Sequence, residues 1–398
     1  MNPKILTTEV QQYIREKAEE KITLPEIVLA KHPFDTISTQ ELAQQIGALR
    51  TIKNKAPSWY QEDFLYYPPK LNLEQTSSEK TALYKASLVS GETLIDLTGG
   101  LGIDTYFFSK KVKKITYCEI NPELSAIASS NFKQLKANNI QTIVTDGIAF
   151  LEKTGQVDWI YVDPARRDSQ NIKVSDLVSY TPNIVETLPL LLKQGKNVLL
   201  KTAPLLDISS GLQQLKNVTE IHIVAIKNEV KELLWVLDKS FEGQPIIKTM
   251  NFEKLGDQKF NYVWTEEAVA KSTFSPPLRY LYEPNVAILK SGAFKILSER
   301  YQVAKLHQHS HLYTSEHLIS FPGRSFIIEQ VLKYDKKSFK SLNITKANVT
   351  IRNFPISVRE IRKRFKIREG GTAFLFFTTS ANDQKIIISC KKAELPKK

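Results

Sequence analysis

The sequence predicts an α/β protein built around a doubly wound parallel sheet, with helices before it and smaller α+β modules after it. Between residues 91 and 225, short apolar strands alternate with helix-length segments, a pattern typical of a parallel sheet covered on both faces. Residues 8–83 carry helical patterns, and short mixed β and α patterns return after residue 275. The length of 398 residues allows two to four domains.

The composition excludes several classes of protein. Hydrophobic residues make up 42% and charged residues 24%, which is ordinary for a globular chain. The apolar runs are only as long as strands, and the first residues contain no signal-peptide core. Two cysteines, Cys118 and Cys390, are too few for a disulfide framework or a zinc-cysteine site. We therefore expect a cytoplasmic protein without a membrane span.

The N-terminal part reads as helical, and we assign residues 1–74 to a helical region. Thr8–Glu20 is amphipathic, and a second helix begins near Thr39. An aromatic and proline-rich loop follows over Trp59–Pro69. Gln75–Ala86 then resembles a capped helix.

A catalytic domain is predicted over residues 75–274. Six strands are expected in order, over Thr93–Leu97, Lys114–Glu119, Gln141–Thr145, Trp159–Val162, Asn197–Lys201 and Glu220–Ala225. Leu233–Leu237 and Tyr262–Trp264 are candidates for further strands near the edge of the sheet. Ser275-Pro-Pro277 is expected to be a linker, because proline breaks regular structure.

Two smaller modules are predicted beyond the linker. In residues 275–320 we expect a β-α-β unit, with elements at Ala287–Leu289, Ala293–Arg300 and a strand that covers Ala304–His307 or extends beyond it. In residues 321–398 the pattern is β-α-β-β, with elements at Asn348–Arg352, Ser357–Phe365, Thr372–Thr379 and Lys385–Cys390.

The positive charge is concentrated in the last module. The whole chain has a formal net charge of +13, and Phe321–Lys398 holds 18 Lys and Arg against 6 Asp and Glu, a net +12. The basic residues are densest over Arg359–Arg368, where apolar residues recur at a spacing that predicts a helix. That asymmetry favours contact with nucleic acid over a merely solvated helix face. The candidate contacts are Arg359, Arg362, Lys363, Arg364, Lys366 and Arg368.

Four expected strands have an acidic residue at or next to their carboxyl end, in chain order. Asp96 is the second-last residue of the first strand and precedes a glycine loop, Glu119 ends the second, Asp146 follows the third and Asp163 follows the fourth. Ligands of open α/β sheets bind outside the carboxyl ends of the strands, near the point where the strand order reverses. A carboxylate after the second strand suits the two hydroxyls of a ribose.

Two nucleotide ligands compete for this pattern. A dinucleotide fingerprint needs a third small residue where Thr105 stands, and it has no use for an acid before the glycines. Here Asp96 precedes the glycines and Asp104 follows them. A ring of negative charge suits a cationic ligand such as S-adenosylmethionine, with its sulfonium, ammonium, ribose and adenine.

The spacing of these residues resembles that of class I S-adenosylmethionine-dependent methyltransferases, which have a Rossmann-like sheet. The resemblance implies that the loop after Asp96 holds the methionine and ribose, Glu119 the ribose, and Asp146 the adenine. Gln75–Ser78 resembles the segment that closes over the cofactor in many RNA methyltransferases, although a helix cap explains it equally well. The implied cofactor-binding residues are Gln75, Ser77, Asp96, Thr98, Gly99, Gly100, Gly102, Asp104, Glu119, Ile120, Asp146, Gly147 and Asp163.

The resemblance also implies that Asp163, Pro164 and Arg166 lie beside the methyl acceptor. Enzymes that methylate amino groups of nucleic acids have an aromatic residue after this motif, whereas the chain reads Asp163-Pro-Ala-Arg-Arg167. Arg166 and Arg167 could stack on a base and hold phosphate, or form surface salt bridges. No cysteine follows the next strand, so we expect direct in-line transfer without a covalent intermediate.

The C-terminal module resembles the THUMP-like domain of certain bacterial methyltransferases, through Asn353-Phe-Pro355 before the basic helix and Gly370-Gly371 after it. The module before it resembles their ferredoxin-like domain. This resemblance implies methylation of RNA, either tRNA or rRNA. A catalytically silent RNA-binding protein and a small-molecule methyltransferase remain as alternatives.

Four of the six histidines lie in one stretch, at His307, His309, His311 and His317. On a strand, the first three would face one side and could bind a metal. No acid or cysteine stands at a suggestive spacing, so an exposed strand or phosphate contacts are favoured and no metal is expected.

Overall fold

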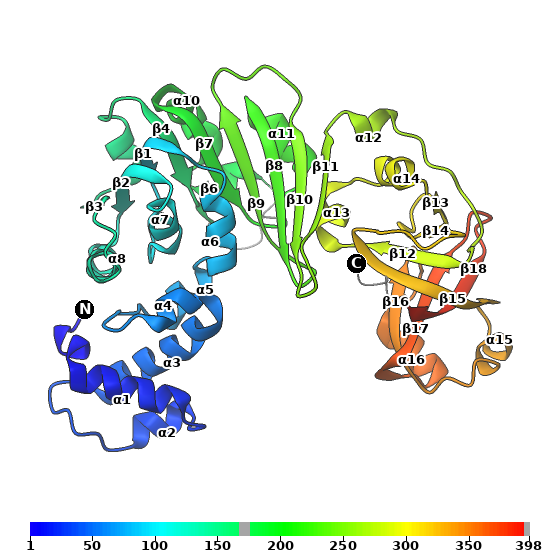
Figure 1. Cartoon of the computed structure of the whole chain (residues 1–398), viewed down its shortest axis with the longest axis horizontal. Helices are drawn as coiled ribbons and strands as arrows, with labels where there is room; N and C mark the ends of the chain where they lie inside the picture. Colours follow the sequence, from blue (N-terminus) through cyan, green and yellow to red (C-terminus); the bar gives the residue numbers. More distant parts are fainter. Residues whose placement is uncertain (167–175, 394–398) are drawn as a thin grey trace. The chain divides into compact units, whose positions relative to one another are not determined.

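The computed structural model describes residues 1–166 and 176–393 and confirms the mixed α/β class. The chain forms two compact units, one of Met1–Val218 with Trp235–Glu242 and one of Thr219–Leu234 with Gly243–Lys398. The described residues contain a sheet of nine strands and a sheet of seven (Figure 1). No helix among them is both long and apolar enough to cross a membrane.

The first unit begins with a helical region. Its elements are η1 (Pro3–Leu6), α1 (Thr8–Glu19), α2 (Leu24–Leu29), α3 (Thr39–Lys55), α4 (Pro57–Gln61), α5 (Lys70–Gln75) and α6 (Glu79–Ala86). Ser38 and Glu41 form a capping box that starts α3, which is the centre of this region. The Arg50 guanidinium of α3 donates to four main-chain carbonyls at and after the end of α1, which a helix terminus leaves unpaired.

The nine-stranded sheet has the strand order β11-β10-β8-β9-β7-β4-β1-β2-β3. The strands are β1 (Gly91–Asp96), β2 (Val112–Glu119), β3 (Ile140–Val144), β4 (Val157–Val162), β7 (Gly195–Thr202), β8 (Val218–Ile226), β9 (Glu229–Asp238), β10 (Ile246–Phe252) and β11 (Gln258–Val263). All eight strands expected in this region are present, and β10 is an additional one. The pairs β1–β2, β1–β4, β2–β3 and β4–β7 are parallel.

The position of β1 determines where a ligand can bind. From β1 the chain builds β2 and β3 on one side, and then β4 and β7 on the other, so the order reverses between β1 and β4. The elements between these strands are α7 (Ile103–Phe108), α8 (Pro122–Gln134), α9 (Gly147–Leu151), the pair β5 (Ala165–Arg166) and β6 (Tyr180–Thr181), η2 (Leu177–Ser179) and α10 (Ile184–Gln194); α11 (Ile208–Gln214) follows β7. The carboxyl ends of β1, β2, β4 and β7 therefore lie along one edge at the reversal point.

The second unit contains the seven-stranded sheet, in the order β13-β14-β12-β15-β18-β17-β16. Its strands are β12 (Tyr280–Pro284), β13 (Ala304–Lys305), β14 (Tyr313–Ser315), β15 (Gly323–Lys333), β16 (Lys346–Arg352), β17 (Arg368–Thr379) and β18 (Lys385–Lys392). The helices of this part are α12 (Glu266–Val269), α13 (Val286–Ser291), α14 (Lys295–Tyr301), α15 (Lys336–Lys340) and α16 (Val358–Phe365).

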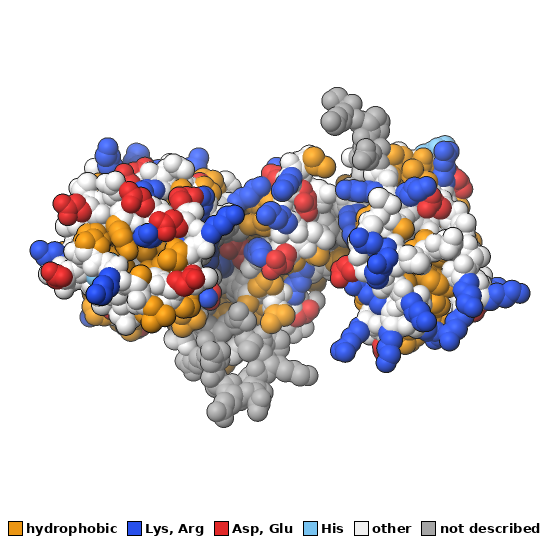
Figure 2. Space-filling view, turned by 90° about the horizontal axis from the view of Figure 1, so that it is seen from below, with side chains coloured by type: hydrophobic (Ala, Val, Ile, Leu, Met, Phe, Trp, Pro, Cys, Tyr) orange, Lys and Arg blue, Asp and Glu red, His pale blue; other side chains and the backbone are white. Residues whose placement is uncertain are grey.

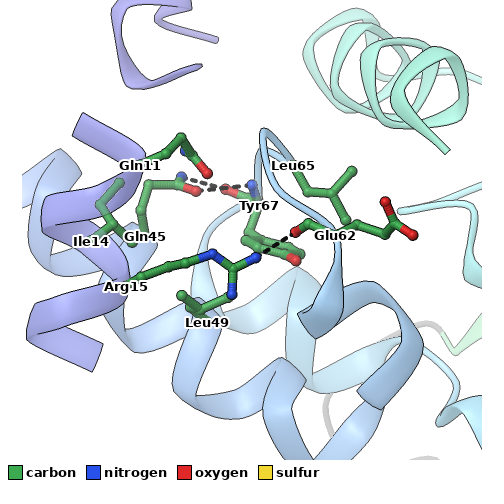
Figure 3. Close-up of a pocket in the computed structure, with 8 residues that line it drawn as sticks. All are labelled: Gln11, Ile14, Arg15, Gln45, Leu49, Glu62, Leu65 and Tyr67. Carbon is green, nitrogen blue, oxygen red and sulfur yellow. Dashed lines mark hydrogen bonds between the residues drawn. The ribbon is translucent and has the colours of Figure 1, made fainter. Parts of the chain in front are cut away.

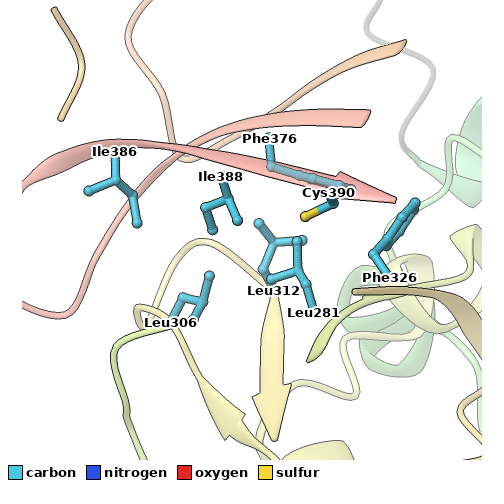
Figure 4. Packing of buried hydrophobic residues seen from close by; sticks show 8 residues of the cluster. All are labelled: Leu281, Leu306, Leu312, Phe326, Phe376, Ile386, Ile388 and Cys390. Carbon is cyan, nitrogen blue, oxygen red and sulfur yellow. The ribbon is translucent and has the colours of Figure 1, made fainter. Parts of the chain in front are cut away.

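The last five residues of β17 and the middle of β18 are buried, and because successive side chains of a strand point to opposite faces, they fill two apolar clusters. On one face, Phe376 and Ile388 belong to a cluster with Leu281, Leu306 and other apolar side chains (Figure 4). On the other face, Phe377 and Ile387 belong to a cluster completed by α15 and α16; the two helices meet through Phe339 and Phe365, whose ring centroids are 4.3 Å apart.

One predicted strand is wrong. Ala287–Leu289 lies inside helix α13, and the strand of this region is β12, which ends just before it. The side chain of Asn285 accepts a hydrogen bond from the main chain of Ile288 and starts the helix, while Gly292 at a positive φ of 78° ends it. The apolar run fits either structure, and the caps on both sides decide for a helix.

Candidate active site

The glycine loop after β1 leads directly into α7. Gly102 adopts a left-handed conformation with φ of 83° and precedes α7. A Cβ at Gly99 would lie 2.1 Å from the ring of Tyr117, and one at Gly102 would lie 2.3 Å from the ring of Phe132. Only glycine fits both positions without displacing an aromatic ring.

Asp96 is a buried carboxyl without a cationic partner among the described residues. It is 1% exposed and accepts hydrogen bonds from the main chain of Thr98 (3.0 Å) and the hydroxyl of Thr105. Burial raises the pKa of Asp96 to about 7, with smaller contributions from the negative charges of Asp104 and Asp163, and the two hydrogen bonds oppose the rise. A cationic ligand would stabilise its ionised form.

Asp104, the second residue of α7, lies in a buried network. Its Oδ2 accepts from the hydroxyls of Ser77 and Tyr161, both at 2.8 Å, and its Oδ1 lies 3.1 Å from Nζ of the fully buried Lys85. Although burial acts to raise the pKa of Asp104, the charges of Lys85 and Lys201 and the hydrogen bonds hold it below its ordinary value. The network ties Ser77, just before α6, to the helix that follows the glycine loop.

Glu119, at the end of β2, is hydrogen-bonded to the glycine loop. Its Oε2 accepts from the main chain of Gly100 at 2.8 Å, and its Oε1 accepts from the main chain of Asn121 at 2.8 Å. Ile120 beside it is 69% exposed. A carboxylate and an exposed apolar side chain thus lie next to each other at this strand end.

Asp146 and Gly147 lie at the start of α9. Asp146 is exposed, and its Oδ1 accepts from the main chain of Ala149 at 2.9 Å, so it caps the helix. A Cβ at Gly147 would lie 2.2 Å from the carbonyl oxygen of Leu97, the residue after β1. Gly147 therefore lets α9 begin against the glycine loop.

Asp163 follows β4 and is linked to two neighbouring elements. Its main-chain N–H donates to the hydroxyl of Thr98 at 2.7 Å, and its Oδ2 accepts from Nζ of Lys201, at the end of β7, at 2.6 Å. Pro164 beside it is buried. The hydroxyl of Thr98 joins the first and fourth strand ends directly.

The structure therefore brings together most of the predicted cofactor-side residues. Thr98 is hydrogen-bonded to both Asp96 and Asp163, Ser77 is hydrogen-bonded to Asp104, and Glu119 accepts from the main chain of Gly100 in the glycine loop. Gln75 is the exposed last residue of α5, and no described residue bonds to its side chain.

Arg166 is the last residue of β5. Arg167 lies outside the described residues.

The sequence interpretation did not identify Lys85, Thr105, Tyr161 or Lys201. Lys201 had a detectable signal, because a charged residue stands at the carboxyl end of an apolar central strand. Lys85 had none, since a lysine within a helix gives no indication of burial.

The basic residues predicted for nucleic-acid contact lie on and after α16. Arg359, Lys363, Arg364, Lys366 and Arg368 are exposed. The guanidinium of Arg362 donates to Glu369 at 2.8 Å, and that of Arg364 lies 4.9 Å from the ring centroid of Tyr334. Figure 2 shows the molecule from below the view of Figure 1. Lys and Arg side chains, in blue, gather over the part that contains α15 and α16.

The histidine stretch does not form the predicted strand, because β13 ends at Lys305. His307 is hydrogen-bonded to Asn353 and lies 3.1 Å from Asp383, whereas His311 stacks on Phe294 with ring centroids 3.6 Å apart. Across the described part of the chain, no three His, Cys, Asp or Glu residues are placed to hold a metal ion.

A small cavity lies in the helical region (Figure 3). Its volume of about 10 Å³ is about enough for one water molecule. Gln45 exchanges two hydrogen bonds with the main chain of Tyr67 beside it, and Arg15 donates to the carbonyl of Glu62. The cavity is too small for a nucleotide cofactor. Its lining residues are Gln11, Ile14, Arg15, Gln45, Leu49, Glu62, Leu65 and Tyr67.

The strand order and the acidic strand ends around the glycine loop are those of a class I methyltransferase, the class of enzymes that depend on S-adenosylmethionine. Residues 280–322 match a ferredoxin-like domain, and residues 323–392 match a THUMP domain-like family. No curated protein matches the sequence.

Over its whole length the chain is similar to a solved structure from Porphyromonas gingivalis W83 assigned as a methyltransferase. The identity is 33%, 99% of each chain is covered, and the TM-score is 0.88. The protein belongs to the family of bacterial methyltransferases that carry a C-terminal THUMP-like domain. A structure of M. capricolum TrmK with S-adenosylhomocysteine shares 14% identity over 44% of this chain and 72% of its own; its TM-score of 0.33 is too low to support an inference.

Proposed function

We propose that the protein transfers a methyl group from S-adenosylmethionine to RNA, in direct in-line transfer, with the cofactor bound at the carboxyl edge of β1, β2 and β4. The observation that carries this proposal is the set of acidic strand ends, Asp96, Glu119 and Asp163, at the point where the strand order reverses. S-adenosylmethionine supplies a methyl group on a positively charged sulfur.

The residues at this edge fit the cofactor. Asp96 is a buried carboxyl that lacks a cation among the described residues, which suits the ammonium group. Glu119 stands beside the glycine loop, where a carboxylate could accept from both ribose hydroxyls, and the exposed Ile120 offers an apolar surface for the adenine ring. We assign Asp163, which follows β4, to the acceptor side of the site.

The cysteines do not support a covalent route. Cys118 is buried inside β2 and Cys390 inside β18. Burial raises the pKa of the Cys118 thiol to about 12, and burial also raises the pKa of Cys390. A thiol that stays protonated is a poor nucleophile, which favours direct transfer.

Cofactor binding is tested by replacing Glu119 with Ala. We expect the affinity for S-adenosylmethionine to fall at least tenfold, because hydrogen bonds to a charged group contribute about 1.5–3 kcal/mol each. Calorimetry measures the affinity, and Glu152→Ala, an exposed acid at the end of α9, is the control. Unchanged affinity in Glu119→Ala would remove Glu119 from the site.

We propose that RNA binds the face formed by α15 and α16. The two helices pack side by side through Phe339 and Phe365, and α15 adds the exposed Lys336, Lys337 and Lys340 to the arginines of α16. The matched segment, residues 323–392, holds 16 Lys and Arg against 5 Asp and Glu. Such a surface complements a phosphate backbone.

The RNA face is tested by charge reversal. Lys363, Lys366 and Arg368 are exposed, and changing all three to Glu should weaken binding of total RNA at least tenfold and make the affinity less dependent on salt. Reversal of Lys4, Lys21 and Lys31, exposed lysines of the helical region, changes the net charge equally and is the control. Equal losses in both triple variants would mean that only net charge matters.

A further inference from the structure

Lys201 and Asp163 form an ion pair across two neighbouring strands. Val162 of β4 pairs with Leu200 of β7, so the next residue of each strand, Asp163 and Lys201, also lie beside each other at the carboxyl edge. Their charged atoms are 2.6 Å apart. The side chain of Lys201 is 14% exposed and that of Asp163 is 34% exposed. The pair therefore lies at the border between the sheet and the solvent.

This ion pair fixes one oxygen of Asp163 and leaves the other available. Oδ2 accepts from Lys201, and no described residue donates to Oδ1. The main chain of Asp163 is held as well, because its N–H donates to Thr98 in the glycine loop. Asp163 thus has a hydrogen-bonded main chain, one oxygen held by Lys201 and one oxygen without a partner among the described residues.

We propose that Lys201 is a positioning residue for methyl transfer, which holds Asp163 so that Oδ1 accepts the proton of the methyl acceptor. The inference rests on the proposed function and specifies the acceptor: a nitrogen or oxygen of an RNA nucleotide that carries a proton. A carbon nucleophile would need a covalent cysteine, and both cysteines are buried.

The proposed step is balanced. A lone pair of the acceptor forms the new bond to the methyl carbon, and the carbon–sulfur bond breaks with its electron pair remaining on sulfur. The proton leaves the acceptor atom for Oδ1 of Asp163. General-base catalysis of this kind contributes about 10²–10⁴-fold, and it depends on the base lying within hydrogen-bond reach of the proton.

Lys201 has a second possible role, which the test must separate. Burial acts to raise the pKa of Asp104, and the charge of Lys85 lowers it. The charge of Lys201 also lowers it, by a smaller amount. If Lys201 acted mainly through Asp104, its removal would weaken the binding of S-adenosylmethionine. If it acts through Asp163, removal slows transfer and leaves cofactor binding intact.

The experiment compares Lys201→Met with Lys201→Arg and with a matched control. Lys196 of β7 pairs with Asp158 of β4 at 2.7 Å, across the same two strands but near their opposite ends. Lys196→Met therefore removes a more exposed Lys–Asp pair between these strands, away from the site. The acceptor probe is total RNA from a strain that lacks the protein. The measurements are kcat, the calorimetric affinity for S-adenosylmethionine, and the nucleosides that become methylated.

We expect Lys201→Met to lower kcat at least tenfold, while its affinity for the cofactor stays within twofold of wild type. Lys201→Arg should recover part of the lost kcat. Lys196→Met should behave like wild type. The double variant Lys201→Met with Asp163→Asn should be no slower than Asp163→Asn alone, because one residue acts through the other. Urea unfolding should be measured for the wild type, Lys201→Met, Asp163→Asn and the double variant. The loss in free energy of unfolding in the double variant should differ from the sum of the losses in the two single variants.

Three results would overturn the role of Lys201 and leave the methyltransferase assignment intact. They are a normal kcat in Lys201→Met, additive losses of kcat in the double variant, and a fall in cofactor affinity as large as the fall in kcat. The methylated nucleosides separate base nitrogen from ribose oxygen as the acceptor, and a carbon-methylated product would contradict the inference. Absence of methyl transfer by the wild-type protein would overturn the proposed function and this inference together.

Discussion

Two carboxyls of the site, Asp96 and Asp104, are buried to a similar extent but differ in their partners. Asp104 has Lys85 within ion-pair distance and two hydroxyl donors. Among the described residues, Asp96 has one main-chain and one hydroxyl donor, with two further carboxyls nearby. Burial of a charge without a partner is unfavourable, whereas a paired charge is tolerated. The difference indicates that Asp104 supports the structure and that Asp96 is available for a cation.

This contrast predicts how stability depends on pH. The pKa of Asp96 is about 7 in the folded protein and about 3.8 when unfolded, so between these values the folded state holds a proton that the unfolded state releases. Stability therefore falls as pH rises through this window. Relative to Asp96→Asn, the free energy of unfolding of the wild type should fall by about 1.4 kcal/mol per pH unit. Urea titrations at pH 5, 6, 7 and 8.5 measure this; a difference independent of pH would show that Asp96 is ionised throughout.

The buried Lys85 gives a second prediction at this scale. Lys85→Met leaves Asp104 without its nearest cation, and breaking a buried ion pair costs about 3–5 kcal/mol. The free energy of unfolding, measured with urea, should fall by that amount. Lys80→Met, at an exposed position of the same helix, should change it by no more than about 1 kcal/mol, as for an exposed charge. Equal effects of the two variants would contradict the network around Asp104.

The sequence reveals the acids of the site but not their partners. Asp96, Glu119 and Asp163 can be found because each ends a recognisable apolar strand. Lys85 and Tyr161 lie 19 and 57 residues from the carboxyl that they contact, and only the packing of α6 and β4 around α7 brings them together. Long-range ion pairs have no local signature, so these contacts required the structure.

At the scale of elements, the loop between β1 and α7 connects several parts of the site. It carries the Thr98 hydroxyl that binds the main chain of Asp163, and the Gly100 N–H that binds Glu119. Three strand ends are thus held in place by one short loop. Any change in its course should alter cofactor binding as well as stability.

Gly102→Ala tests this constraint. The new Cβ would lie 2.3 Å from the Phe132 ring, and alanine rarely adopts the φ of 83° found here. We therefore expect the free energy of unfolding to fall by about 1–3 kcal/mol. The affinity for S-adenosylmethionine should fall at least tenfold. Gly155→Ala is the control, because a Cβ there has no neighbour within 4 Å. Thermal unfolding and calorimetry measure the two effects; normal cofactor affinity in Gly102→Ala would mean that the loop does not shape the site.

The predictability of the elements follows from the same physics. The central strands β4 and β7 contain apolar runs of consecutive buried residues, and such runs stand out between helices. β15 does not stand out, because it is an eleven-residue strand of which only Phe326 is buried, and its pairing with β12 and β18 defines it. Where burial of side chains is weak, main-chain pairing decides the structure, and that pairing is non-local.

At the scale of the whole molecule, the chemistry and the charge belong to different segments. Every residue proposed for the cofactor precedes Lys201, whereas Phe321–Lys398 carries a net +12. The basic segment is not a detachable tail: β15 to β18 share a sheet with β12, and Leu281 packs with Phe326 and Phe376. A cut at residue 320 would expose this core, so substitutions on the surface test RNA binding more cleanly than deletion.

The central claim is that this protein methylates RNA with S-adenosylmethionine at a site that includes Asp163. The most direct measurement is incubation of total RNA, from a strain that lacks the protein, with isotopically labelled S-adenosylmethionine, followed by mass spectrometry of the nucleosides. We predict labelled methyl on one kind of nucleoside with the wild-type protein, and none with Asp163→Ala, which still binds the cofactor. The claim would be contradicted if RNA stayed unlabelled while the wild-type protein binds S-adenosylmethionine. It would also be contradicted if both proteins labelled RNA equally.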